Sequence, residues 1–156
     1  MIKGIIWDFN RTIYDPDLPR ENSDIKGGLT PGITRILRQL HQADYRMCLI
    51  SKAADGGRMG LISDFGLSEY FRHIELVSGN KTVEHFQHCL TATELKYFEM
   101  AVVGDRVWEE IRIGKLLHMR TIWYAAGKFS GQESRCPEEQ PDFTIANLAD
   151  VVDCLK

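Results

Sequence analysis

The apolar run Ile5, Ile6 and Trp7 stops abruptly at Asp8. A buried parallel strand reads as a continuous hydrophobic segment, and ligands of open α/β sheets bind beyond the carboxyl ends of the strands. Three more polar residues stand at comparable points: Ser51 and Asp105 end apolar runs, and Lys81 opens a helical segment. Each of them alone suits a turn or a helix cap. Together the four are a nucleophile, a hydroxyl donor, a cation and a second carboxylate, a set that suits phosphoryl transfer.

The elements that must position these residues alternate along the chain between strand and helix patterns. Five apolar runs are predicted as strands of one sheet, with a sixth segment as a short edge strand: Ile2–Trp7, Tyr45–Ile50, His73–Val77, Phe98–Val103, Arg120–Tyr124 and, at the edge, Phe143–Ile145. Strands that alternate with helices predict an α/β fold, a three-layer α/β/α sandwich around a central parallel sheet, with the first strand near its centre.

Capping residues predict where the helices begin. Thr30 is expected as an N-cap, with Pro31 at the first helical position. Asp55 is a candidate cap for the next helix, Arg106–Leu117 is predicted as one continuous helix, and Asn147 is expected to cap the last one.

Length and composition fit an ordinary globular domain. The chain is 44% hydrophobic and 26% charged and carries a net charge of −3. We expect residues 1–156 to form one domain, with 13–29 as a short flap-like insertion that is too small for a cap domain. The charge does not favour a nucleic-acid partner, and no apolar run approaches the length of about 20 residues that spans a membrane. The N-terminus shows no signal-peptide pattern, so we expect a cytoplasmic protein.

The four cysteines are scattered and form no C-x-x-C pair, which is typical of reduced thiols. Cys89 lies within helical reach of His85 and His88. A metal site there is the weaker alternative, because no second cluster of ligands supports it, and we interpret the three residues as one face of a helix.

The motifs around these residues resemble those of the haloacid dehalogenase-like (HAD) superfamily, from one end of the chain to the other. The first motif, Asp-x-Asp-x-Thr after an apolar strand, corresponds to D-F-N-R-T at Asp8–Thr12. The second is a Ser or Thr after a strand, here Ser51 in L-I-S, and the third is Lys81 in G-N-K-T. The fourth, Gly-Asp-x-x-x-x-Asp, corresponds to G-D-R-V-W-E-E, with Asp105 and Glu110. The resemblance is to the capless phosphatases of this superfamily.

The resemblance implies a Mg²⁺-dependent phosphohydrolase in which Asp8 attacks phosphorus and forms an aspartyl-phosphate. An ionised carboxylate needs no base to act as a nucleophile. The ion would be held by Asp8, Asp105 and the backbone carbonyl of Asn10, and Glu110 would orient Lys81 or a water on the metal. The residues expected to contact the substrate, a small or macromolecular phosphate ester, are Thr12, Ser51, Lys52 and Lys81.

Asn10 departs from the family pattern, since it replaces the Asp that protonates the leaving group and then activates water. General acid–base catalysis typically contributes about 10²–10⁴-fold, or about 2.7–5.4 kcal/mol of barrier. We therefore expect lost efficiency rather than lost metal binding, because the metal contact uses the backbone. An enzyme that works without this acid, and a substitution introduced by design, are both compatible with the sequence.

Several alternatives to a phosphohydrolase remain open. Asn10 favours a non-catalytic module that kept the metal site. A haloacid dehalogenase would need the Asp nucleophile and no metal, and Lys81 argues mildly against it. A flavodoxin-like receiver domain is the nearest rival in fold. An open site suits large substrates or a cap from a second subunit, so a homo-oligomer is also an alternative.

For other side chains near the motifs, the sequence predicts whether they face the site, the solvent or the core. Arg11 is equally compatible with a substrate contact and with a solvated side chain, and Arg58 is expected to face the same opening as Lys52. Trp7 and Trp123 are predicted as core residues. Trp108 is predicted to pack on its helix, with a place at the rim of the site as the alternative.

Overall fold

A six-stranded parallel sheet forms the centre of the protein, in a computed structural model that describes residues 1–53 and 56–156. The strand order is β5-β4-β1-β6-β7-β8, and every neighbouring pair is parallel. The strands are β1 (Gly4–Asp8), β4 (Arg46–Lys52), β5 (Phe71–Val77), β6 (Met100–Gly104), β7 (Arg120–Tyr124) and β8 (Phe143–Ile145). The predicted central place of the first strand is confirmed.

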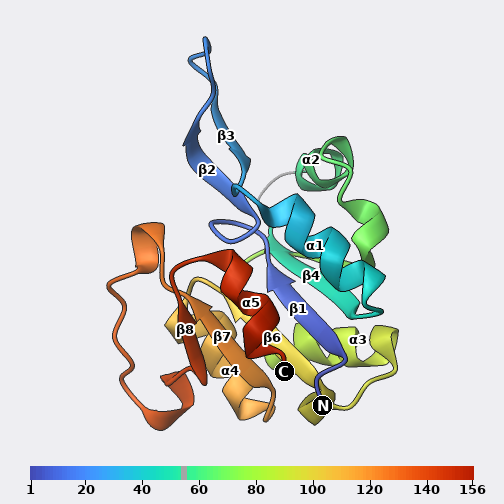
Figure 1. The fold of residues 1–156 in the computed structure, drawn as a ribbon. Helices are drawn as coiled ribbons and strands as arrows, with labels where there is room; N and C mark the ends of the chain where they lie inside the picture. The colour runs from blue at the N-terminus through green and yellow to red at the C-terminus, as the bar shows by residue number, and fades with distance from the viewer. Residues whose placement is uncertain (54–55) are drawn as a thin grey trace.

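Helices cover both faces of this sheet, as Figure 1 shows. One face carries α1 (Ile33–Gln42), α2 (Arg58–Asp64) and α5 (Val151–Cys154), and the other carries α3 (Val83–Thr93) and α4 (Arg112–Leu116). The predicted three-layer sandwich is confirmed.

Alternation along β1 explains why it reads as a continuous apolar run. Ile5 and Trp7 are buried in the core under α1 and α5, whereas Ile6 is buried in the second core under α3 and α4. Because side chains alternate across a strand, a strand covered on both faces needs apolar residues at every position.

Strand boundaries differ from prediction at several ends. Ser51 and Lys52 belong to β4 itself rather than to the loop after it. Strand β6 begins at Met100, since Tyr97–Glu99 forms a 3₁₀ turn that leaves Phe98 exposed. The predicted strand, which began at Phe98, was therefore too long at this end.

The start of α1 corrects the prediction for Thr30 and Pro31. The N-cap is Gly32, whose φ of 84° breaks the helix path, so that Thr30 and Pro31 lie before the helix. The Thr30 hydroxyl instead donates to the backbone carbonyl of Thr12 at 2.7 Å. It ties the start of the helical layer to the loop that follows Asp8.

The segment Arg106–Leu117 also differs from the prediction of one continuous helix. It begins with a π-helix, Val107–Ile111, and continues as α4. A π-turn holds one residue more than an α-turn. The prediction for Asn147 is confirmed, because its side chain accepts a hydrogen bond from Ala149 N at 3.0 Å. Asp55 lies outside the described residues.

Between β1 and α1 lies an antiparallel hairpin of β2 (Tyr14–Pro19) and β3 (Lys26–Leu29). Figure 1 shows that it projects from the end of the molecule at which β1 finishes. No described helix has the length and apolar character needed to cross a bilayer.

Candidate active site

The two predicted carboxylates meet at the centre of the sheet. Asp8 is the last residue of β1, and Asp105 follows the adjacent β6. Both are buried, and oxygen atoms of Asp8, Asp105 and Glu110 lie within 4.8 Å of one another. The prediction that Asp8 and Asp105 lie close enough to share an ion is therefore consistent with the geometry.

Lys81 provides the positive charge inside this group. Its ammonium donates to Asp8 Oδ1 and, at 2.8 Å, to Glu110 Oε1. Burial lowers the pKa of Lys81, but the charges of Asp8 and Glu110 more than reverse this, and the pKa lies above its usual value. Lys81 is therefore a fixed cation.

A close approach of two chain segments explains the glycine of the Gly-Asp motif. A Cβ at Gly104 would lie 2.9 Å from Cβ and Cγ of Glu110, which is closer than side chains tolerate. The missing side chain lets Glu110 lie against β6 and reach Lys81.

Thr12 holds the nucleophile candidate from the other side. Its hydroxyl donates to Asp8 Oδ2 at 3.1 Å, and Thr12 is fully buried. Ser51 is fully buried as well, and its hydroxyl donates to the carbonyl of Lys52 at 3.2 Å. Neither hydroxyl lies on the wall of the hollow at the site. Their predicted contact with the substrate stays a prediction.

Glu109 was not singled out from the sequence, although it makes three polar contacts beside the site. Its Oε1 accepts from the backbone N–H of Lys81 at 2.9 Å, and its Oε2 from Lys52 Nζ at 2.8 Å. Arg106 approaches Oε2 at 3.1 Å. The signal for Glu109 is the pair of acids four and five residues after Asp105. The π-helix lets both reach Lys81, one at its ammonium and one at its backbone.

A hollow of about 180 Å³ opens over the carboxylates. Its wall consists of Asp8, Asn10, Arg11, Lys52, Lys81, Asp105, Arg106, Glu110, Lys128 and Phe129. Arg106 lies 4.6 Å and Lys128 5.4 Å from the centre of the Phe129 ring. Arg106 stands within the quoted Gly-Asp motif but was not singled out, and Lys128 and Phe129 lie in a 3₁₀ turn, Gly127–Phe129, that carries no motif.

Of the other side chains predicted near the site or in the core, some lie where they were predicted and others do not. Arg11 has a φ of 63° and pairs with Asp17 of the hairpin at 2.6 Å. Arg58 lies 4.9 Å from the centre of the Phe9 ring and is not on the wall of this hollow. Trp7 is fully buried as predicted, whereas Trp123 is half-buried and donates to the Asp105 carbonyl at 2.9 Å.

The cysteine and histidine residues hold no second metal cluster among the described residues. His85 Nδ1 accepts from the Thr82 backbone, within the cap of α3, and His88 contacts Glu75 at 2.7 Å. Cys89 is buried beside Cys48, and all four cysteines are free.

A divalent cation fits the carboxylate group. Asp105 Oδ2 is buried and has no hydrogen-bond partner among the described residues. Burial and the neighbouring charges of Asp8 and Glu110 raise the pKa of Asp105 to about 9. Burial also raises the pKa of Glu110 to about 7, despite the ion pair with Lys81. These raised pKa values reflect the repulsion that three ionised acids would feel beside a single lysine, a repulsion that a bound cation would relieve, and hard oxygen ligands suit Mg²⁺.

Comparison with known proteins agrees with this geometry. The family described as HAD-hydrolase-like matches residues 80–151. Glyceraldehyde 3-phosphate phosphatase from Methanocaldococcus jannaschii is 30% identical over 124 residues, which are 69% of this chain and 53% of that protein. The phosphatase of the same name from Pyrococcus furiosus is 25% identical over 131 residues, or 81% and 54% of the two chains. This chain thus spans about half the length of these curated relatives.

Solved structures share the fold over the whole chain. A putative phosphatase from Clostridium difficile has a TM-score of 0.81 at 15% identity and covers 99% of both chains. A HAD phosphatase from Thermococcus onnurineus has a TM-score of 0.79 at 15% identity and covers 99% of this chain and 98% of that one. At these identities the likeness shows the fold alone.

Proposed function

We propose, from the premise that this chain is a haloacid dehalogenase-like hydrolase, which the family match over residues 80–151 supports, that it is a phosphohydrolase that acts on a phosphate ester through Asp8. The observation that carries the proposal is the buried carboxylate of Asp8 at the end of the central strand. One of its oxygens accepts from Thr12 and the other from Lys81. A carboxylate held in this way is oriented for attack on an electrophile above the sheet.

The first step would be an in-line displacement at phosphorus. A bond forms between an Asp8 carboxylate oxygen and phosphorus, and the bond to the ester oxygen breaks. Lys81 balances part of the negative charge that gathers there. Water then attacks phosphorus in the aspartyl-phosphate, and inorganic phosphate leaves while Asp8 is restored.

Mg²⁺ is the cofactor that we propose, with Asp8, Asp105 and the backbone carbonyl of Asn10 as the groups that would hold it. When bound, it would neutralise charge on the phosphate. Glu110 keeps Lys81 in place through the 2.8 Å contact. Isothermal titration calorimetry with Mg²⁺ should give one site, which Asp105→Ala should remove. Unchanged Mg²⁺ binding in that variant would contradict the assignment.

We expect Asn10 to determine which phosphate esters are hydrolysed at a measurable rate. Its side chain cannot protonate a departing alkoxide, so esters of phenols and acyl phosphates, which leave as stable anions, should react faster than alkyl phosphates. The relatives are named glyceraldehyde 3-phosphate phosphatases. Glyceraldehyde 3-phosphate is an alkyl phosphate, and we expect this chain to turn it over slowly.

Phosphate release from aryl, acyl and alkyl esters, with and without Mg²⁺, tests the proposal. Activity should require both the ion and Asp8, with Asp8→Asn as the inactive control. A non-catalytic module, which Asn10 favours as the second candidate, would bind Mg²⁺ and release no phosphate from any ester. Release of halide from a 2-haloacid without metal would instead indicate a dehalogenase.

Two further predictions remain proposals. One is that the chain forms a single domain with residues 13–29 as a flap; the hairpin beside Arg11 supports it. The other is that a second copy of the chain closes the site.

A further inference from the structure

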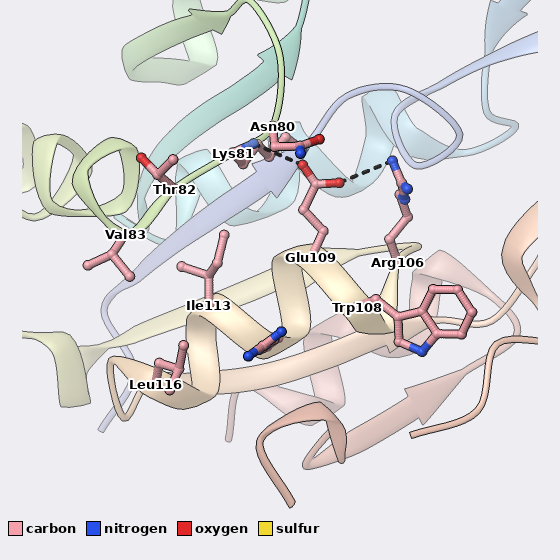
Figure 2. A pocket seen from close by; sticks show the side chains of 10 residues that line it. Asn80, Lys81, Thr82, Val83, Arg106, Trp108, Glu109, Ile113 and Leu116 are labelled. Carbon is pink, nitrogen blue, oxygen red and sulfur yellow. Dashed lines mark hydrogen bonds and ion pairs between the residues drawn. The ribbon is translucent and has the colours of Figure 1, made fainter. Parts of the chain in front are cut away.

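A second hollow, of about 430 Å³, lies next to the site. Figure 2 shows it between the loop that leads into α3 and the π-helix with α4. Its lining residues are Asn80, Lys81, Thr82, Val83, Arg106, Trp108, Glu109, Arg112, Ile113 and Leu116. Lys81 and Arg106 line both hollows, so this groove begins where the reaction site ends.

Trp108 forms a fixed aromatic surface in the groove. Its side chain is 41% exposed, yet its indole N–H already donates to the Glu133 carbonyl at 2.8 Å. The guanidinium of Arg135 lies 4.3 Å from the ring centre and is itself held by Glu139, with contacts of 2.7 and 3.0 Å. An exposed ring that is held in one orientation loses little entropy when a ligand packs on it. The remaining polar need of Trp108 is met, so its exposed surface offers apolar contact.

Apolar residues continue this surface along the groove. Val83 and Ile113 lie on opposite walls in Figure 2, and Leu116 is 49% exposed at the far end. Water-exposed apolar side chains in a concave surface are typical of ligand sites.

One cation in the groove is exposed and available to a ligand. Arg112 makes no hydrogen bond or ion pair within the described part of the chain, and its charge acts on Glu139 only at longer range. Arg106, by contrast, is paired with Glu109. The charge available at the distal part of the groove is therefore positive, and it favours an anionic group.

We propose that this groove binds the leaving-group portion of an extended phosphate ester, whose apolar or aromatic part packs on Trp108 and Leu116 and whose distal anionic group pairs with Arg112. The proposal rests on the proposed function, because the phosphoryl group must occupy the adjoining site. It assigns a substrate class: phosphate esters with an apolar spacer and a second anion.

A series of aryl phosphates with matched charges tests it. The substrates are phenyl phosphates that carry a para carboxyalkyl chain of increasing length, each compared with its methyl ester. Because the phenol hardly changes, kcat should stay constant, and KM should be about fivefold lower for the acid than for its ester at one optimal length. Arg112→Gln should remove this difference, and Trp108→Ala should raise KM for both. The exposed Arg38→Gln on α1 is the matched control and should change neither.

A binding measurement separates this proposal from the proposed function. The chain has three tryptophans, so its NMR spectrum should contain three indole N–H signals, and Trp108→Phe identifies one of them. Titration with the dephosphorylated carboxyalkyl phenol should move the Trp108 signal, and less so in Arg112→Gln. If this shift occurs but no ester is hydrolysed, the proposed function fails and the groove stands. If the Trp108 signal does not move, the groove proposal is overturned, whatever the turnover.

Discussion

Two consecutive glutamates take part in two different charge networks. Glu110 belongs to the inner network, which consists of Asp8, Lys81, Asp105 and Glu110 and whose side chains are almost entirely buried. Glu109 belongs to the outer network with Lys52 and Arg106, whose side chains are each 33% exposed. In the inner network each charge depends on the other members, because water cannot compensate for a loss. In the outer network water can compensate for the loss of a charge. We therefore expect substitutions there to reduce activity and stability only partly.

The largest effect should come from Lys81→Met, which leaves Asp8 and Glu110 without a counter-charge. Breaking a buried ion pair by removing one partner costs about 3–5 kcal/mol of unfolding free energy. The proposed phosphatase activity should disappear as well. Urea denaturation measures the loss, and Lys96→Met, at an exposed position, is the control. A loss below about 1 kcal/mol would show that the inner network is more hydrated than its burial indicates.

Asn10→Asp adds a carboxylate at the edge of the inner network. It should raise turnover of alkyl phosphates by about 10²–10⁴-fold, because a general acid becomes available. In the chain with Asn10, rapid mixing with an aryl ester should show a burst of phenol, since attack of water on the aspartyl-phosphate then limits the rate. Equal turnover of alkyl and aryl esters, unchanged in Asn10→Asp, would mean that another group supplies the proton.

Glu109→Gln tests the outer network. The amide oxygen can still accept from the Lys81 backbone, but the ion pairs with Lys52 and Arg106 are lost. Hydrogen bonds to charged groups contribute about 1.5–3 kcal/mol, so we expect a stability loss in the lower part of this range and about a tenfold change in kcat/KM. The exposed Glu84→Gln in the first turn of α3 is the control. If Glu109→Gln were as damaging as Lys81→Met, the distinction between the two networks would be wrong.

Asp17→Asn should have the smallest effect. Its hydrogen bond and ion pair with Arg11 lower the pKa of Asp17, but the group is exposed to solvent. The thermal midpoint of unfolding should not change. Releasing Arg11 should alter KM by less than about threefold, in line with the weakness of exposed pairs. A clear fall in thermal midpoint would show that the hairpin is bound to the body through this contact.

The sequence predicts the sheet well because each central strand is covered on both faces. The run Arg120–Tyr124 was predicted with the bounds that the structure has, and so was the exposed edge strand Phe143–Ile145. Asp8 and Asp105 were found together because parallel strands end on the same edge of the sheet.

Features that depend on tertiary contacts were not predicted. Thr30 is of a residue type that often caps helices, but its hydroxyl donates to the backbone carbonyl of Thr12 instead. Glu109 lies in a predicted amphipathic helix, where neighbouring residues point in different directions. In the structure it lies in the π-helix and pairs with Lys52, and neither spacing nor propensity signals that turn.

Because of the π-helix, the site depends more on the number of residues between Asp105 and α4 than on the types of those residues. Successive residues of a helix point about 100° apart. Deleting Trp108 would leave room for an ordinary α-turn, and a single acid would then face Lys81, with no partner left for Lys52. A shortened chain could keep every charged side chain of both networks and still lose their arrangement. Insertions and deletions in this stretch should therefore be tolerated far less than substitutions at its exposed positions.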